Sequence, residues 1–351
     1  MRPDETAYRR IYGDLRDKIV AGDWPAGARL PSKRQTAADY GVSVITAEHA
    51  YSLLCDEGYA EARERSGTYA AYRPKDRFPV GETREALPPA QPHAGGDFPY
   101  SVYAKTVRRV LADYEGILYE KSPAGGLPLL RRTLADYLAR SRGIRTDPEN
   151  ILIGSGSEYL YTLIPMLLGR GRVFAVESPS YGQILRIYRA SGILCEELPL
   201  SKNGIDSAAL EASRAEVLHI TPYRSYPSMV TASASKRHEY LSWAEERGGF
   251  LIEDDVESEF SPRSRPTETL FSLDSERVIY LNTFSKTLFP SLRAAYMVLP
   301  SALLPVCRET VGHLSCTVPV LEQCVLTELI GRGDFERHLN RMRRRLGRSK
   351  P

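Results

Sequence analysis

The 351-residue sequence has few cysteines and no long apolar segment. Its five cysteines are an odd number, lie far apart and include no CxxC pair. That usage argues against a disulfide framework or a zinc site, and for reduced thiols in a cytoplasm. No apolar run approaches the ~18 residues of a membrane-spanning helix, and the first residues are polar. We therefore expect a soluble cytoplasmic protein with no metal site, neither secreted nor membrane-bound.

A strong excess of charge of either sign is also missing. The 47 Lys and Arg residues nearly balance the 44 Asp and Glu residues, and 42% of the chain is apolar. This balance neither predicts nor excludes a nucleic-acid partner. The length is sufficient for two domains, each with its own core.

The first 72 residues predict three helices followed by a small hairpin. Apolar residues recur at helical spacing before Gly22, and Ser32 and Ser43 are placed to cap the next two helices. Such a pattern is typical of a winged helix-turn-helix, although it also suits a helical bundle with no nucleic-acid role. The expected helices cover 5–21, 33–40 and 43–58, and the expected strands cover 59–64 and 68–72.

Several short motifs stand in this region: Leu30-Pro-Ser-Lys-Arg34, Gly41-Val-Ser43, Ala50-Tyr51 with Glu57-Gly58-Tyr59, and Ser66-Gly67-Thr68. In their order and spacing they resemble the GntR family of bacterial DNA-binding domains. In such domains the third helix enters the major groove and the wing approaches the minor groove. The resemblance therefore implies double-stranded operator DNA as the partner. It assigns DNA contacts to Arg34, Ser43, Thr46, Arg65 and Gly67.

The third helix departs from that family in its charge. Many members have basic residues there, whereas this chain has Val44, Ile45 and Glu48. Glu48 could accept a hydrogen bond from a cytosine amino group, or it could face solvent. Residues 1–75 hold 12 basic and 11 acidic side chains, so we expect modest phosphate affinity per monomer. A homodimer with two half-sites would compensate.

Prolines and glycines without hydrophobic periodicity predict an extended linker over 73–97. From residue 98 to 351 strand and helix patterns alternate, which predicts an α/β domain with a mostly parallel sheet. Ligands bind such sheets at the carboxyl ends of the strands. The expected strands cover 151–153, 172–176, 215–220, 249–252 and 278–281, and the expected helices cover 102–114, 127–142 and 158–168.

Lys286 follows the last of these strands, lies among small hydroxyl residues and precedes Arg293 by seven residues. This combination suits pyridoxal 5'-phosphate (PLP), which needs an amine for a Schiff base and hydroxyls and a guanidinium for its phosphate. It also needs a carboxylate for the pyridine nitrogen, and three acids stand at 253–255. Spacing alone does not separate Asp254 from Asp255. The alternative interpretation of Lys286 is an exposed surface lysine.

The region from residue 98 onward contains a series of short motifs: Pro123-Ala-Gly-Gly126, Gly154-Ser-Gly-Ser157, Ser178-Pro-Ser-Tyr181, Ile252-Glu-Asp-Asp255 with Ser258-Glu-Phe260, and Thr283-Phe-Ser-Lys286. With these motifs the region resembles the fold-type I aminotransferases, and the whole chain resembles the MocR subfamily of GntR regulators. That subfamily joins a winged helix-turn-helix to an aminotransferase-like domain that binds PLP. The resemblance also implies a homodimer.

The resemblance implies a role for each candidate site residue. Lys286 would bond to PLP, Asp254 would pair with the pyridine nitrogen, and Tyr181 would stack on the ring. The phosphate contacts that it implies are Gly156, Ser157 and Glu158 at a helix N-terminus, with Thr283, Ser285 and Arg293.

The Glu158 side chain has a simpler explanation than phosphate binding. Ser155 and Glu158 have the spacing of a capping box, in which the Glu158 side chain would reach back to the Ser155 N–H. Its charge would otherwise oppose a phosphate. We therefore expect only the Glu158 backbone to contribute to the phosphate site.

Three departures from the family bear on enzyme activity. Val256 stands where the regulators usually carry a tyrosine that contacts PLP, and Tyr226-Pro227 stands where aminotransferases have Asn-Pro. The sequence also stops at Pro351, soon after the basic run 341–346. The resemblance implies a small C-terminal domain beyond that point, with an arginine for the substrate carboxylate. We interpret the basic run as part of an amphipathic helix that is cut short, rather than as a nucleic-acid-binding tail.

Three hypotheses follow. The leading one is a PLP-binding, DNA-binding transcriptional regulator that senses an amino compound or PLP itself. The alternative is a PLP-dependent aminotransferase with an accessory DNA-binding domain, and the missing arginine argues against efficient turnover. The third is a DNA-binding protein whose cofactor pocket no longer functions.

Overall fold

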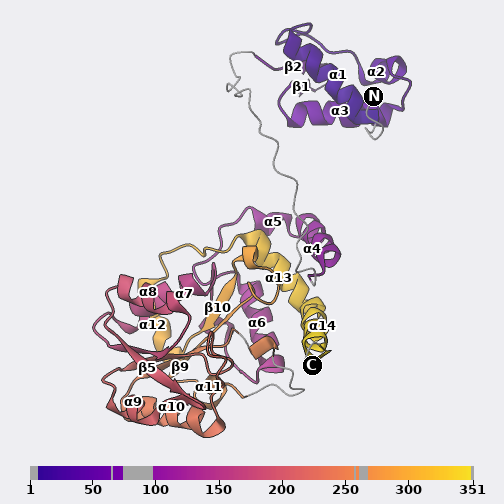
Figure 1. Cartoon of the computed structure of the whole chain (residues 1–351). Helices are drawn as coiled ribbons and strands as arrows, with labels where there is room; N and C mark the ends of the chain where they lie inside the picture. Colours follow the sequence, from indigo (N-terminus) through magenta and orange to yellow (C-terminus); the bar gives the residue numbers. More distant parts are fainter. Residues whose placement is uncertain (1–6, 65, 74–97, 257, 261–267, 349–351) are drawn as a thin grey trace. The chain divides into compact units, whose positions relative to one another are not determined.

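The computed structural model describes residues 7–64, 66–73, 98–256, 258–260 and 268–348. The chain divides into two compact units, residues 1–92 and 93–351, and each is described by itself (Figure 1). Apart from Arg73, the predicted linker lies outside the described residues.

The first unit has the predicted three helices and hairpin. Both predicted caps are present, since Ser32 Oγ accepts from the Gln35 N–H and Ser43 Oγ accepts from the Thr46 N–H, each at 3.1 Å. Such side-chain caps satisfy backbone donors that the first helical turn leaves free. The helices are α1 (Ala7–Ala21), α2 (Lys33–Asp39) and α3 (Val44–Asp56), and β1 (Ala60–Arg63) pairs antiparallel with β2 (Gly67–Ala70).

The second unit is built on an eight-stranded sheet with the order β3-β10-β9-β8-β7-β4-β5-β6. The central strands β9, β8, β7, β4 and β5 run parallel, and β10 and β6 pair antiparallel with their neighbours. The strands are β3 (Ile151–Gly154), β4 (Phe174–Ser178), β5 (Cys195–Ser201), β6 (Gly204–Ile205), β7 (Val217–Ile220), β8 (Phe250–Asp254), β9 (Val278–Thr283) and β10 (Ala295–Val298). The principal helices are α4 (Tyr100–Asp113), α6 (Pro128–Ser141), α7 (Ser157–Leu168), α8 (Gly182–Ala190), α9 (Ser207–Ala212), α10 (Ala234–Glu246), α12 (Leu304–Thr310), α13 (Val320–Gly331) and α14 (Asp334–Arg348), with the single turns α5 (Glu115–Leu118) and α11 (Leu270–Leu273).

Successive residues of the central strands point to opposite faces of the sheet and enter two separate cores. Leu251 and Val278 pack in the core that holds α6, α10 and α13, whereas Ile252 and Ile279 pack in the core that holds α7, α8 and α12 (Figure 1). This alternation decides where the acids at the end of β8 point. Glu253 continues the row of Leu251, and Asp254 continues the row of Ile252.

The structure confirms the five predicted strands and adds β5, β6 and β10. β5 was missed because it contains two glutamates and a proline and is only partly buried. β10 is four residues long, too short for a periodic signal. All five cysteines are free. Within the described ranges, no helix combines the length and apolarity needed to cross a membrane.

Candidate functional site

A cavity of about 380 Å³ lies at the carboxyl ends of the parallel strands. Asp254 ends β8, Thr283 ends β9, and Thr221 follows β7, so chain segments far apart in sequence meet there. Every proposed cofactor residue lines the cavity except Gly156, which lies beside it. The lining residues are Ser157, Glu158, Tyr161, Tyr181, Thr221, Tyr226, Asp254, Val256, Thr283, Ser285, Lys286 and Arg293.

Asp254 forms the buried polar end of the cavity. Its Oδ2 accepts a hydrogen bond from the Tyr161 hydroxyl, and His219 Nε2 lies 3.6 Å from the same oxygen. The Tyr188 hydroxyl in turn lies 2.7 Å from His219 Nδ1. Asp254 Oδ1 is buried, and no group among the described residues hydrogen-bonds to it. The carboxylate is therefore held in place by one oxygen and free to accept from a ligand with the other.

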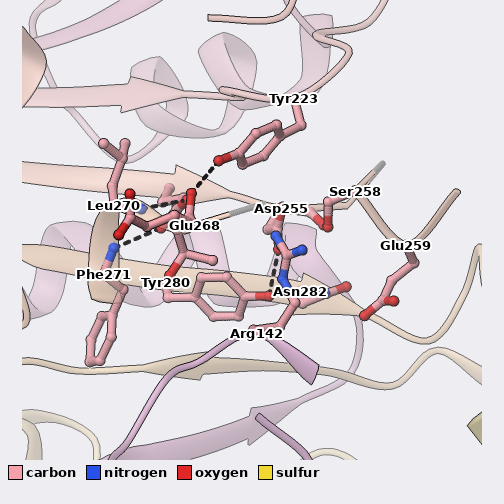
Figure 2. Close-up of polar contacts among 12 residues, drawn as sticks. Arg142, Tyr223, Asp255, Ser258, Glu259, Glu268, Leu270, Phe271, Tyr280 and Asn282 are labelled. Atoms are coloured by element: carbon pink, nitrogen blue, oxygen red, sulfur yellow. Dashed lines mark hydrogen bonds and ion pairs between the residues drawn. The ribbon is translucent and has the colours of Figure 1, made fainter. Parts of the chain in front are cut away.

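Asp255 points to the opposite face of the sheet and has a different environment. Its side chain is fully buried and forms an ion pair with Arg142, whose side chain is 5% exposed. The Tyr280 hydroxyl donates to the same oxygen at 2.7 Å, as Figure 2 shows. Burial raises the pKa of Asp255, and the Arg142 guanidinium opposes that rise. The two neighbouring acids are thus distinguished by strand alternation, with Asp254 facing the cavity and Asp255 neutralised in the core.

The other end of the cavity gathers groups that suit an anion. Ser157 begins α7, whose N-terminal N–H groups favour negative charge. Lys286 and Arg293 both lie on the loop between β9 and β10, which is closed by a 2.9 Å hydrogen bond from the Phe284 N–H to the Ala294 carbonyl. Ser285 Oγ is buried, without a hydrogen-bond partner in the part of the chain that the structure describes.

The prediction of a capping box at Ser155 was wrong. The Ser155 N–H donates to Thr317 Oγ1 at 2.9 Å, and the residue that caps α7 is Gly156, with φ of 98°. The Glu158 carboxylate points away from Ser155, pairing with Arg293 and accepting from Tyr181. Sequence spacing could not anticipate this, because the competing partners are distant in the chain.

Of the proposed DNA contacts that the structure describes, three are exposed and Thr46 is half-buried. Arg34 is exposed on α2, and Ser43 and Thr46 lie at the start of α3 with their hydroxyls 2.8 Å apart. Gly67 begins β2 with φ of 126°, a conformation that favours glycine. Arg65 lies outside the described residues.

Three further side chains define the character of the α3 surface. Val44 and Ile45 are 46% and 67% exposed at the first turn of the helix. Glu48 is exposed to solvent, and its carboxylate pairs with Lys33 Nζ at 2.6 Å. That hydrogen bond lowers the pKa of Glu48. The start of α3 therefore presents an apolar pair beside a neutralised ion pair.

Two family models match the chain, one for each unit. The model for bacterial regulatory proteins of the gntR family matches residues 7–70, and the model for aminotransferase class I and II matches residues 98–350. The chain is 32% identical to the probable rhizopine catabolism regulatory protein MocR of Rhizobium meliloti, over 97% of this chain and 75% of that protein. The chain belongs to the MocR-type GntR regulators.

Other similarities agree with this MocR-type organisation. The uncharacterized HTH-type transcriptional regulator YdeL of Bacillus subtilis is 32% identical over 97% of this chain and 77% of its own length. The α-aminoadipate aminotransferase LysN of Thermus thermophilus superposes with a TM-score of 0.63 and 31% identity, over 71% of this chain and 64% of LysN. The two relatives that match 97% of this chain are thus named regulators, whereas the aminotransferase LysN matches 71% of it. They favour the regulator over the aminotransferase alternative.

The cavity of this MocR-type chain has donors and acceptors that fit PLP. The free, buried Asp254 Oδ1 would accept from a protonated pyridine nitrogen. Ser285 Oγ and the start of α7 would serve a phosphate, and Gly156 leaves room for Arg293, because a Cβ there would lie 2.5 Å from Arg293 Nη2. Tyr181, predicted to stack on the ring, lines the cavity and is 40% exposed.

Sequence reasoning missed Tyr161 and Glu177. Tyr161 lies four residues after Ser157, one helical turn away, and that spacing alone could have indicated it. Glu177 on β4 is buried and accepts from Ser225 Oγ and from the Thr221 N–H. It therefore fixes the loop after β7, which carries Tyr226 into the cavity wall.

We expect Glu177 to make the stability of this regulator depend on pH. Burial raises the pKa of Glu177 to about 7, from an ordinary value of 4.5. Because the folded state holds the proton more tightly, this contribution to stability is complete below the unfolded pKa and is lost as pH rises through about 7. As the pH rises from 4.5 to about 7, the parent should lose roughly 3 kcal/mol of unfolding free energy relative to Glu177→Gln. Urea unfolding at several pH values in this range measures the loss, and Glu246→Gln, at an exposed position, is the control. If the unfolding free energies of the parent and Glu177→Gln changed in parallel with pH, the prediction would be wrong.

Proposed function

We propose that this protein is a transcriptional regulator that binds operator DNA as a homodimer in the cytoplasm and responds to PLP, or to an amino compound that reacts with it. The observation that carries the proposal is the occurrence in one chain of a winged helix with an exposed recognition surface and a cavity that gathers Lys286, Asp254 and Arg293. A ligand in the cavity would bias the conformation in which the regulator binds DNA.

The cavity residues divide the work of holding PLP. Bound PLP supplies an aldehyde that reacts with amines and a ring that withdraws electrons. Lys286 would provide the amine within the cavity, and Asp254 would keep the ring nitrogen protonated by accepting a hydrogen bond from its N–H. Arg293, Ser157 and Ser285 would bind the phosphate. Thr283 also lines the cavity, and its Oγ1 donates to the Ala294 carbonyl at 3.2 Å.

The start of α3 supplies the proposed sequence readout. Exposed Val44 and Ile45 suit the methyl groups of thymine in the major groove, which apolar side chains contact. Ser43 and Thr46 would contact base edges or the backbone, and Arg34 and the wing at Arg65 and Gly67 would contact phosphates. With few cations per monomer, two half-sites in a dimer would provide the affinity.

Footprinting on the DNA upstream of the protein's own coding region tests the proposal. We expect the parent to protect two half-sites. Arg34→Ala should weaken binding about three- to tenfold on all sequences and reduce the salt slope by about 2, because each subunit of the dimer loses one phosphate contact. The control is Arg214→Ala, which removes an 89% exposed arginine from the second unit. A parent protein that protects no site in that region would refute the regulator.

A further inference from the structure

The anion-binding end of the cavity already contains an anion, the carboxylate of Glu158. Its Oε2 lies 2.7 Å from Arg293 Nη2, and its Oε1 accepts from the Tyr181 hydroxyl at 3.0 Å. Both partners line the cavity. The guanidinium that a phosphate would need is therefore engaged by a side chain of the same protein.

The backbone on both sides is shaped to make this pair. Gly156 has φ of 98°, and any Cβ there would collide with the Arg293 guanidinium. Arg293 itself has φ of 46°, a left-handed conformation that is uncommon for a residue other than glycine. Such conformations persist where the surrounding structure enforces them. Together they bring the guanidinium over the first turn of α7, where Glu158 stands.

Charge makes Glu158 a competitor of phosphate. A carboxylate in the first turn of a helix already gains the favourable interaction with the helix N-terminus that a phosphate would otherwise gain. A phosphate that enters must either displace Glu158 from Arg293 or bind beside a like charge. The side chains of Arg293 and Glu158 are 48% and 39% exposed, so water and salt moderate the competition without removing it.

We propose that Glu158 is an internal competitor for the phosphate of PLP and makes the binding of PLP weak enough to be reversible. This rests on the proposed function, in which PLP is the ligand of the cavity. A regulator that reports a ligand has to release it when its concentration falls, whereas an enzyme gains from keeping its cofactor. Glu158 would thus set the PLP concentration to which the regulator responds, and would act on phosphate-bearing ligands only.

Glu158→Gln tests the proposal, because it removes the charge and keeps the shape. Titrations of the full chain with PLP and with pyridoxal, which lacks the phosphate, would be followed by visible absorption. We expect Glu158→Gln to bind PLP about tenfold more tightly at low ionic strength, with the gain shrinking as salt is added. Pyridoxal affinity should stay within about twofold of the parent, since the change acts on the phosphate alone. Glu246→Gln, an exposed change on α10, should leave both affinities as in the parent.

A second measurement needs no PLP. Inorganic phosphate at constant ionic strength should raise the melting temperature of Glu158→Gln more than that of the parent, and Glu158→Gln with Arg293→Met should lose the gain. Equal or weaker PLP binding by Glu158→Gln would overturn the proposal, because Glu158 would then only position Arg293. If neither the parent nor any variant binds PLP, the proposed function fails. The measurement with inorganic phosphate still decides whether Glu158 competes with phosphate. If phosphate raises the melting temperatures of the parent and Glu158→Gln equally, the competition proposal is overturned.

Discussion

Replacing Lys286 with alanine is expected to abolish the covalent attachment of PLP. Lys286 lines the cavity on the loop after β9, near the carboxylate and the guanidinium that would orient the cofactor. Among the described residues that line the cavity, Lys286 carries the only amine, so without it only the weaker contacts to ring and phosphate would remain. The visible band of lysine-bound PLP should disappear, and borohydride treatment should leave no cofactor mass on the variant.

A matched lysine separates this site from general lysine reactivity. Lys202 is exposed on the turn between β5 and β6, and Lys202→Ala should keep both the band and the adduct. A borohydride-stable adduct on Lys286→Ala would place the reactive amine elsewhere. No adduct on the parent would favour a DNA-binding protein whose pocket no longer takes the cofactor.

Replacing Arg142 with methionine is expected to lower the unfolding free energy by about 3–5 kcal/mol. Arg142 and Asp255 form a fully buried pair (Figure 2), so the change leaves a carboxylate without its counter-charge. Burial already raises the pKa of Asp255, and losing the guanidinium removes the strongest interaction that opposes it. Denaturant unfolding of the second unit measures the loss.

Two variants make the interpretation specific to the buried pair. Arg140→Met, in the last turn of α6 two residues before Arg142, removes an arginine that is 57% exposed and pairs with Glu336, and should cost less than about 1 kcal/mol. Adding Asp255→Asn to Arg142→Met should recover most of the lost stability, because position 255 then carries no charge that needs a partner. A double variant as unstable as the single one would show that packing, and not charge, causes the loss.

Local rules predicted the three helices of the first unit, α4, α6 and α7 in the second, the two serine caps and five strands of the large sheet, because each depends on spacing within one segment. Contacts between distant segments decided the rest. The Ser155 N–H was a suitable local partner for the Glu158 side chain, yet the structure pairs Glu158 with Arg293, 135 residues away. Asp254 and Asp255 could not be separated by spacing. Their difference became clear once β8 was paired on both sides, which fixed the alternation of its side chains.

The loop between β9 and β10 has one more consequence. Lys286 and Arg293 lie on the same loop, whose ends are joined by the Phe284–Ala294 hydrogen bond. The group that would bond to the aldehyde of a ligand and the group that would bind its phosphate would therefore move together. The loop also accepts a hydrogen bond at the Thr287 carbonyl from His338 Nε2 on α14, at 2.8 Å. A shift of this loop would move the Lys286 amine and the Arg293 guanidinium away from a bound ligand at the same time. The ligand would then lose both contacts in one step. Through the hydrogen bond between Thr287 and His338, the same shift would also displace α14.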